Sequence, residues 1–134
     1  MKIRHVGLVV KNLGESILFY ESIGFRVFSN EIEQGNHISN FFSEEGLQVH
    51  IAKLKNDFGE CLELLWFGNG TKKKKNSLKS LGLTHIALTV RDSGDLYSSF
   101  KKCCEVQTTP TGHKVLFVQD PNGVFLELVQ DPRC

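Results

Sequence analysis

The sequence has almost no charge imbalance, no long apolar run and no export signal. Lysine and arginine number 16 against 15 acidic residues, and the resulting formal charge of +1 creates no field that would attract nucleic acid or an anionic membrane. The first ten residues, MKIRHVGLVV, hold too short an apolar stretch for a membrane anchor and lack the cleavage site of a signal peptide. We therefore expect a cytoplasmic protein that acts on a small molecule.

Cysteine is scarce, and its spacing excludes a disulfide framework or a zinc-type motif. The four cysteines are Cys61, Cys103, Cys104 and Cys134, and no two of them form a C-x-x-C pair, so we expect reduced thiols. The chain is also short. Its 134 residues, 40% of them apolar, are enough for one core or for two small modules that share one, and too few for two independent enzymatic domains.

The chain contains an internal repeat. HVGLVV at residues 5–10 lines up with HIALTV at residues 85–90, at an offset of 80, and GECLEL at 59–64 lines up with GVFLEL at 123–128, at an offset of 64. The first copy is therefore longer, and we assign the excess mostly to a loop within the polar segment 31–46. The repeat predicts a single domain, 1–134, with module one at about 1–70, a linker at about 71–81 and module two at about 82–134.

Each module has the same order of predicted elements. A strand is followed by the N-cap signal of a helix, Asn12 with Glu15 or Asp92 with Asp95, and then by three more strands. The predicted strands are 5–10, 25–33, 48–55 and 61–67 in module one, and 85–90, 105–109, 114–119 and 124–130 in module two. Turn signals at 56–59 and 120–123 join the last two strands of each module. The prediction is an α+β fold of two βαβββ modules in tandem, with a curved mixed sheet around a cavity.

Strand parity gives the two faces of the first strand in each module different characters. The even positions are apolar and suit packing under the helix, whereas the odd positions carry His5 or His85 followed by mostly small residues. Glu63 and Glu127 each interrupt an apolar last strand, where an unpaired carboxylate would cost several kcal/mol. If the two modules are related by a pseudo-twofold axis, a divalent cation bound by all four side chains would satisfy both carboxylates.

A plainer interpretation makes these residues part of a solvated surface. The histidines would be half-exposed strand ends, and the glutamates would pair with lysines on a wet sheet face. The repetition of His and Glu at matching positions favours the metal site, because a solvated face does not require the same two residue types twice. Four aromatic residues are candidate walls of a substrate pocket or members of the core: Phe41, Phe42, Phe58 and Trp66.

The chain resembles the vicinal oxygen chelate superfamily, which includes glyoxalases, bleomycin-resistance proteins and extradiol dioxygenases. The resemblance lies in the stretches HVGLVVKNLGESILFYESIGF, THIALTVRDSGDLYSSF and FVQDPNGVFLELV. It implies paired βαβββ modules, and it implies that the metal ligands are the first-strand and last-strand residues of each module. Those residues are His5, Glu63, His85 and Glu127. The ion itself stays open among zinc, nickel, cobalt, manganese and iron.

The His-Glu-His-Glu set is most similar to that of glyoxalase I, a lactoylglutathione lyase. The resemblance implies a metal-dependent lyase or isomerase that transfers a proton through a metal-bound enediolate, on a thiol hemithioacetal such as that of methylglyoxal. Glutathione or another thiol would be the co-substrate. Glu127 is expected to be the base that moves the proton, with Glu63 as its partner on the opposite face.

Several alternatives stay open. Glyoxalase I proteins commonly carry an arginine that helps to hold glutathione where this chain has Val9. Methylmalonyl-CoA epimerases often have Gln at the position of Glu63, and bleomycin-binding members typically lack the metal set, so an epimerase-like isomerase and a metal-free drug-binding module are the alternatives. Relatives pair their modules within one chain or across two, and we expect a homodimer. The run Lys72–Lys75 is interpreted as a solvated linker.

Overall fold

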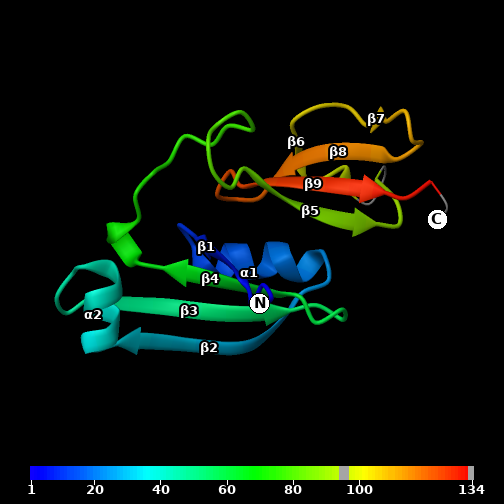
Figure 1. Cartoon of the computed structure of the whole chain (residues 1–134). Coiled ribbons are helices and arrows are strands. Elements are labelled where there is room, and N and C mark those ends of the chain that lie inside the picture. Colours follow the sequence, from blue (N-terminus) through cyan, green and yellow to red (C-terminus); the bar gives the residue numbers. More distant parts are fainter. Residues whose placement is uncertain (94–96, 133–134) are drawn as a thin grey trace. The chain divides into compact units, whose positions relative to one another are not determined.

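The computed structural model describes residues 1–93 and 97–132. The chain divides into two compact units, Met1–Lys73 and Lys74–Cys134 (Figure 1). No helix in the described residues is long and apolar enough to cross a membrane. Cys61, Cys103 and Cys104 carry free thiols, as expected. The fourth cysteine, Cys134, lies outside the described residues.

The first unit is a four-stranded mixed sheet with two helices. Its elements are β1 (Val6–Val9), α1 (Leu13–Ser22), β2 (Arg26–Gln34), α2 (Asn36–Phe42), β3 (Gln48–Lys55), β4 (Cys61–Trp66) and the short 3-10 helix η1 (Gly68–Gly70). The sheet order is β1-β4-β3-β2, with β1 parallel to β4 and the other neighbours antiparallel (Figure 1). The first and last strands of the module are therefore hydrogen-bonded neighbours.

The second unit repeats the strand order of the first sheet. Its strands are β5 (His85–Val90), β6 (Lys101–Lys102), β7 (Gln107–Thr108), β8 (Lys114–Gln119) and β9 (Phe125–Gln130). The order is β5-β9-β8-β6, β7 also pairs with β8, and β5 is parallel to β9. The predicted α+β class, built from two mixed sheets, is confirmed.

Two local predictions differ from the structure, and a third falls partly outside the described residues. The segment 31–46, predicted as a loop, contains α2, because Ile38 is an apolar anchor that packs against Val49 and Ile51. The predicted strand 105–109 is reduced to β7, since this edge segment is mostly exposed and has little apolar surface to hold it on the sheet. The second N-cap signal is Asp92 with Asp95, and Asp95 lies outside the described residues. Of the residues on either side, 91 and 93 form bends, 97 is 3-10 helical, and 98–100 form a turn and a bend.

The helix α1 covers the apolar face of the first sheet. It begins as predicted, because Asn12 Oδ1 accepts a hydrogen bond from the Glu15 N–H at 2.9 Å. The helix contacts β4, and Tyr20 on the helix is buried. Facing strand residues that are at least nine-tenths buried are Leu8, Val10, Ala52, Leu54, Leu62 and Leu64. The main core therefore lies on the face of the sheet opposite Glu63, and a smaller apolar cluster of Ile38, Val49 and Ile51 under α2 takes part of the Glu63 face.

Matching turns set the register of the last hairpin in each module. Asp120 Oδ1 accepts hydrogen bonds from the N–H groups of Asn122 and Val124, both at 2.8 Å. Asn56 Oδ1 accepts from Phe58 at 3.1 Å and Glu60 at 3.0 Å in the same i+2 and i+4 pattern. These side chains replace missing turn hydrogen bonds, which is the usual role of Asp and Asn in tight turns. The register of β3 on β4, and of β8 on β9, follows from them.

Candidate functional site

The first histidine and the first glutamate lie together in unit one. Gly7 on β1 is the register partner of Glu63 on β4, and His5 precedes Gly7 by two residues, so all three lie on one sheet face. His5 Nε2 is 3.3 Å from Glu63 Oε2. The Glu63 side chain is 15% exposed and that of His5 is 37% exposed.

The second histidine and the second glutamate make the same arrangement in unit two. Ala87 on β5 is the register partner of Glu127 on β9, and His85 precedes Ala87 by two residues. His85 Nε2 lies 3.1 Å from Glu127 Oε2. Their side chains are 34% and 25% exposed. In each unit the ring nitrogen and the carboxylate oxygen therefore meet at a site that solvent can reach.

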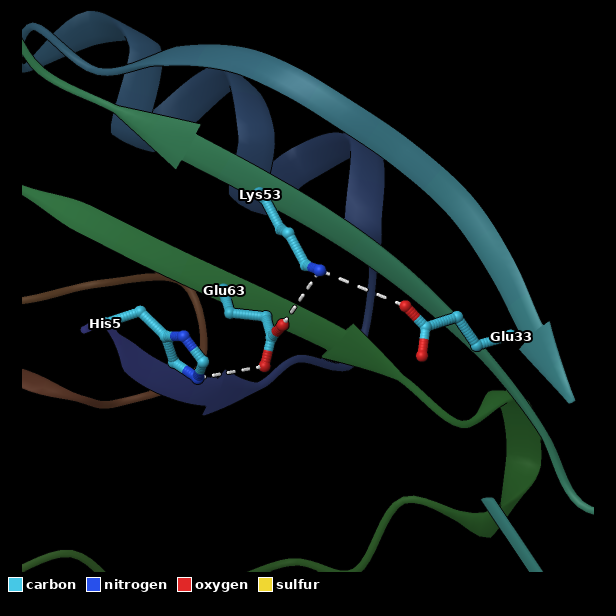
Figure 2. Close-up of polar contacts among 4 residues, drawn as sticks. All are labelled: His5, Glu33, Lys53 and Glu63. Atoms are coloured by element: carbon cyan, nitrogen blue, oxygen red, sulfur yellow. Dashed lines mark ion pairs between the residues drawn. The ribbon is translucent and has the colours of Figure 1, made fainter. Parts of the chain in front are cut away.

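A lysine joins the pair in unit one. Lys53 on β3 is the register partner of Glu63, and its Nζ lies 3.7 Å from Glu63 Oε1 (Figure 2). The same Nζ is 4.0 Å from Glu33 Oε1 on β2. The two oxygens of Glu63 thus have different neighbours, with Oε2 facing His5 and Oε1 facing the ammonium group.

An aromatic ring takes the place of the lysine in unit two. Phe117 on β8 is the register partner of Glu127, and its ring meets that of His85 edge to face, with centroids 5.5 Å apart. The Thr84 hydroxyl lies 2.9 Å from His85 Nδ1. A hydrogen bond at one ring nitrogen orients the other, as is usual for metal-binding histidines. Thr84 therefore holds His85 with Nε2 toward Glu127.

The donor chemistry of each pair fits a divalent cation. One imidazole nitrogen and one carboxylate oxygen are ligands that zinc, nickel, cobalt, manganese and iron accept. In residues 1–93 and 97–132, no three His, Cys, Asp or Glu side chains gather in one group. The structure brings His5 to Glu63 and His85 to Glu127, and the convergence of all four on one ion stays a prediction. The contact between Lys53 and Glu63 is the lysine pairing that the surface interpretation expects.

The aromatic candidates separate by sheet face. Phe42 on α2 packs edge to face on Phe67, with centroids 4.9 Å apart, and Phe67 belongs to the cluster under α2 together with Leu65. By strand parity Leu65 shares its face with Glu63, so α2 covers part of the face that carries this carboxylate. Trp66 has the opposite parity and lies beside His50.

The other two aromatic candidates are solvent-exposed. Phe58 lies in the turn between β3 and β4 and is 90% exposed, and Phe41 on α2 is 75% exposed. All four predicted pocket walls are at least 38% exposed, and Phe42 is the one that packs on the cluster on the Glu63 face.

The residues opposite the two glutamates were missed by the sequence interpretation, although a signal was available. The turns pair Asn56 with Glu60 and Asp120 with Val124. Counting three residues outward from each turn in an antiparallel hairpin puts residue 53 opposite Glu63 and residue 117 opposite Glu127. Lys53 and Phe117 follow from this count without coordinates, whereas the contribution of Glu33 depends on the bulged pairing of β2 with β3.

Comparison with known families gives one match over nearly the whole chain. The family model of the Glyoxalase/Bleomycin resistance protein/Dioxygenase superfamily matches residues 2–128. No curated protein matches the chain.

Solved structures with a similar fold have diverse functions. A glyoxalase family protein from Bacillus cereus has a TM-score of 0.87 and 19% identity, over 97% of this chain and 93% of that one. The trypanothione-dependent glyoxalase I of Leishmania major has a TM-score of 0.67 and 22% identity, over 97% and 86%. A fosfomycin resistance protein from Listeria monocytogenes has a TM-score of 0.65 and 16% identity, over 95% and 91%. At these identities the likeness establishes the fold.

Proposed function

Because the chain belongs to the Glyoxalase/Bleomycin resistance protein/Dioxygenase superfamily, we propose that it is a metal-dependent lyase or isomerase of the glyoxalase I type. Its substrate would be a thiol hemithioacetal such as that of methylglyoxal. The observation that carries the proposal is the repeated pair, with a histidine Nε2 within 3.3 Å of a glutamate Oε2 in one unit and within 3.1 Å in the other. In each unit the pair lies at the first and last strands of the module, which are parallel neighbours, and the glutamate has the equivalent register position in both.

In this proposal His5, Glu63, His85 and Glu127 together hold one divalent cation, within one chain or across a homodimer. When bound, the cation would supply Lewis-acid stabilisation of negative charge on two adjacent substrate oxygens. The partial exposure of all four side chains supports access for such a substrate. The α2 segment with Phe42 offers an apolar neighbour on the Glu63 face for the substituent of the substrate.

Glu127 is the carboxylate best suited to move the proton. Glu63 has two partners that hold it, His5 and Lys53, whereas Glu127 contacts His85 and, within the part of the chain that the structure describes, pairs with no lysine or arginine. A carboxylate with fewer partners is freer to leave its resting position. Glu127 would take the proton from the carbon beside the carbonyl group and return it to the neighbouring carbon.

The thiol is a separate question, because Val9 stands where glyoxalase I proteins commonly have an arginine. The neighbour from Leishmania major is trypanothione-dependent, and a thiol other than glutathione is therefore a reasonable co-substrate for this chain. An epimerase that acts on a thioester such as methylmalonyl-CoA would use a related ligand set, often with Gln at the position of Glu63, and it would replace the proton on the carbon that lost it, from the opposite face.

A second candidate is a metal-free binding module of the bleomycin-resistance type. The contact that favours it is the one between Lys53 and Glu63, because an ammonium group at 3.7 Å already neutralises a carboxylate that the enzyme would use as a ligand. Such a module would bind its ligand on the same sheet face and would need no ion.

Metal content and activity together test the proposal. We expect protein purified without added ions to contain about one metal per site, and the protein loaded with nickel, cobalt or zinc to isomerise the methylglyoxal hemithioacetal of at least one thiol. His85→Ala should lose metal and remain folded, because β5 packs through its even positions. Metal-loaded protein that is inactive with every thiol would favour the epimerase. Protein that binds no metal would favour the binding module.

A further inference from the structure

We propose that Lys53 is a built-in counter-ion of Glu63 that competes with a divalent cation for this carboxylate. Lys53 would therefore set how tightly the unit-one ligands hold the metal. The inference rests on the proposed function only in taking Glu63 as a metal ligand. It makes Lys53 a positioning residue, since the side chain acts through Glu63 and touches neither the ion nor the substrate.

The position of Lys53 is fixed by the backbone. The Asn56 turn sets the hairpin register, and this register puts Lys53 directly opposite Glu63 on the face that carries the His5 pair. Side chains opposite each other on an antiparallel pair have Cβ atoms about 4.5–5.5 Å apart, which is within easy reach of a lysine. The ammonium group is thus held near Glu63 by the sheet itself.

The ammonium group has a second carboxylate partner. Its Nζ lies 3.7 Å from Glu63 Oε1 and 4.0 Å from Glu33 Oε1, and the lysine side chain is 39% exposed (Figure 2). A lysine between two carboxylates can turn toward Glu33 when a cation takes Glu63, and it keeps an ion pair when it does. The exchange is therefore reversible, because the ammonium group keeps one carboxylate partner in either position.

Electrostatics set the direction of the effect. A positive charge this close to a ligand oxygen repels an incoming divalent cation, and partial exposure screens the repulsion without abolishing it. Removing the charge should tighten cation binding by roughly tenfold. Removing Glu33 should do the opposite, because Lys53 would then have Glu63 as its sole carboxylate partner among the ion pairs of this unit.

The experiment measures Mn²⁺ binding by the full chain after treatment with a chelator, using electron paramagnetic resonance of the free ion. Mn²⁺ is chosen because its preference for oxygen and nitrogen keeps it away from the thiols of Cys103 and Cys104. Lys53→Met keeps the length of the stem and removes the charge, and Lys53→Arg keeps the charge. Lys55→Met is the matched control, since Lys55 has the same strand parity and lies opposite Cys61.

Relative to wild type, we expect roughly tenfold tighter binding for Lys53→Met, an unchanged constant for Lys55→Met and a change below about twofold for Lys53→Arg. If the aliphatic part of the Lys53 side chain served only in packing, the Met side chain would replace it, and Lys53→Met would bind Mn²⁺ as wild type does. Equal binding by wild type and Lys53→Met would overturn the inference and leave the proposed function standing. Binding by Lys53→Met alone would support the inference and overturn the metal-dependent function of the wild type. No binding by either protein would overturn both.

Discussion

The two units hold the same pair of donors at the same register but surround it differently. Opposite Glu63 stands Lys53, and at the equivalent position opposite Glu127 stands Phe117. The repeated backbone therefore sets where the donors lie, and a single side chain on the neighbouring strand decides whether the carboxylate has a cationic partner. Within the ranges 1–93 and 97–132, Glu127 has no such partner.

For the histidines the order is reversed, because the one in unit two has more contacts than the one in unit one. His85 lies within β5, with its Nδ1 beside the Thr84 hydroxyl and its ring against Phe117, whereas His5 precedes β1. Unit one thus holds its carboxylate more firmly, and unit two holds its imidazole more firmly. In the proposed function, this difference would give the role of base to Glu127 and leave Glu63 as a ligand, without any change in the order of the strands.

The largest expected effect is a loss of turnover when Glu127 or Glu63 is replaced by Gln, one at a time. Glu127→Gln keeps one coordinating oxygen, so turnover of the methylglyoxal hemithioacetal should fall by at least roughly 10²-fold while metal content changes much less. Glu63→Gln should cost less in turnover, because Glu63 is already held by Lys53 and His5. Both variants are measured beside wild type for rate and metal content. An active wild type with an equally active Glu127→Gln would remove the proton-transfer role.

Much of the fold was predictable because the repeat doubles each signal. The N-cap at Asn12, the strands of the last hairpin in each module and the apolar even face of the first strand all follow from local patterns. The pairing of His5 with Glu63, and of His85 with Glu127, was also predictable, since parallel first and last strands bring equivalent positions together. Relative placement of the two pairs has no local signal in the sequence.

Other features were missed because they depend on tertiary contacts. The helix α2 is seven residues long, which is too short for a helix to be stable alone, and it forms where Ile38 can pack on Val49 and Ile51, more than ten residues away in the chain. The predicted strand 105–109 of unit two is reduced to β7, because most of its side chains are exposed and add little apolar contact that would hold it on the sheet. The Lys53 contact with Glu33 required the register of a bulged pairing.

The two hairpin turns offer a smaller, structural test of the comparison. Asp120 is 4% exposed, and Asp120→Ala would remove the side-chain oxygen that accepts from the Asn122 and Val124 N–H groups in a partly buried turn. We expect a loss of about 2–3 kcal/mol in the free energy of unfolding. Asn56→Ala removes the same two bonds from a more exposed turn and should cost about 1 kcal/mol, because water can replace them.

Urea unfolding distinguishes these two losses. Far-UV circular dichroism follows the whole chain, and fluorescence of Trp66, the single tryptophan, reports the unit that contains Asn56. Asp120→Asn is the control, since its side-chain oxygen can still accept both hydrogen bonds, and it should lose about 1 kcal/mol or less. Equal losses for Asp120→Ala and Asn56→Ala would show that burial of the turn does not set the cost.

The smallest expected effect comes from making unit two resemble unit one. Phe117→Lys puts an ammonium group opposite Glu127, where the Lys53 arrangement predicts an ion pair that opposes both cation binding and proton transfer. Mn²⁺ affinity should fall by about fivefold, and turnover should fall with it, since Glu127 would then be held as Glu63 is. Phe117→Leu, which removes the ring contact with His85 without adding charge, is the control and should stay within about twofold of wild type. If both variants weaken binding equally, the ring against His85 matters more than the missing charge, and the difference between the units lies in the histidines.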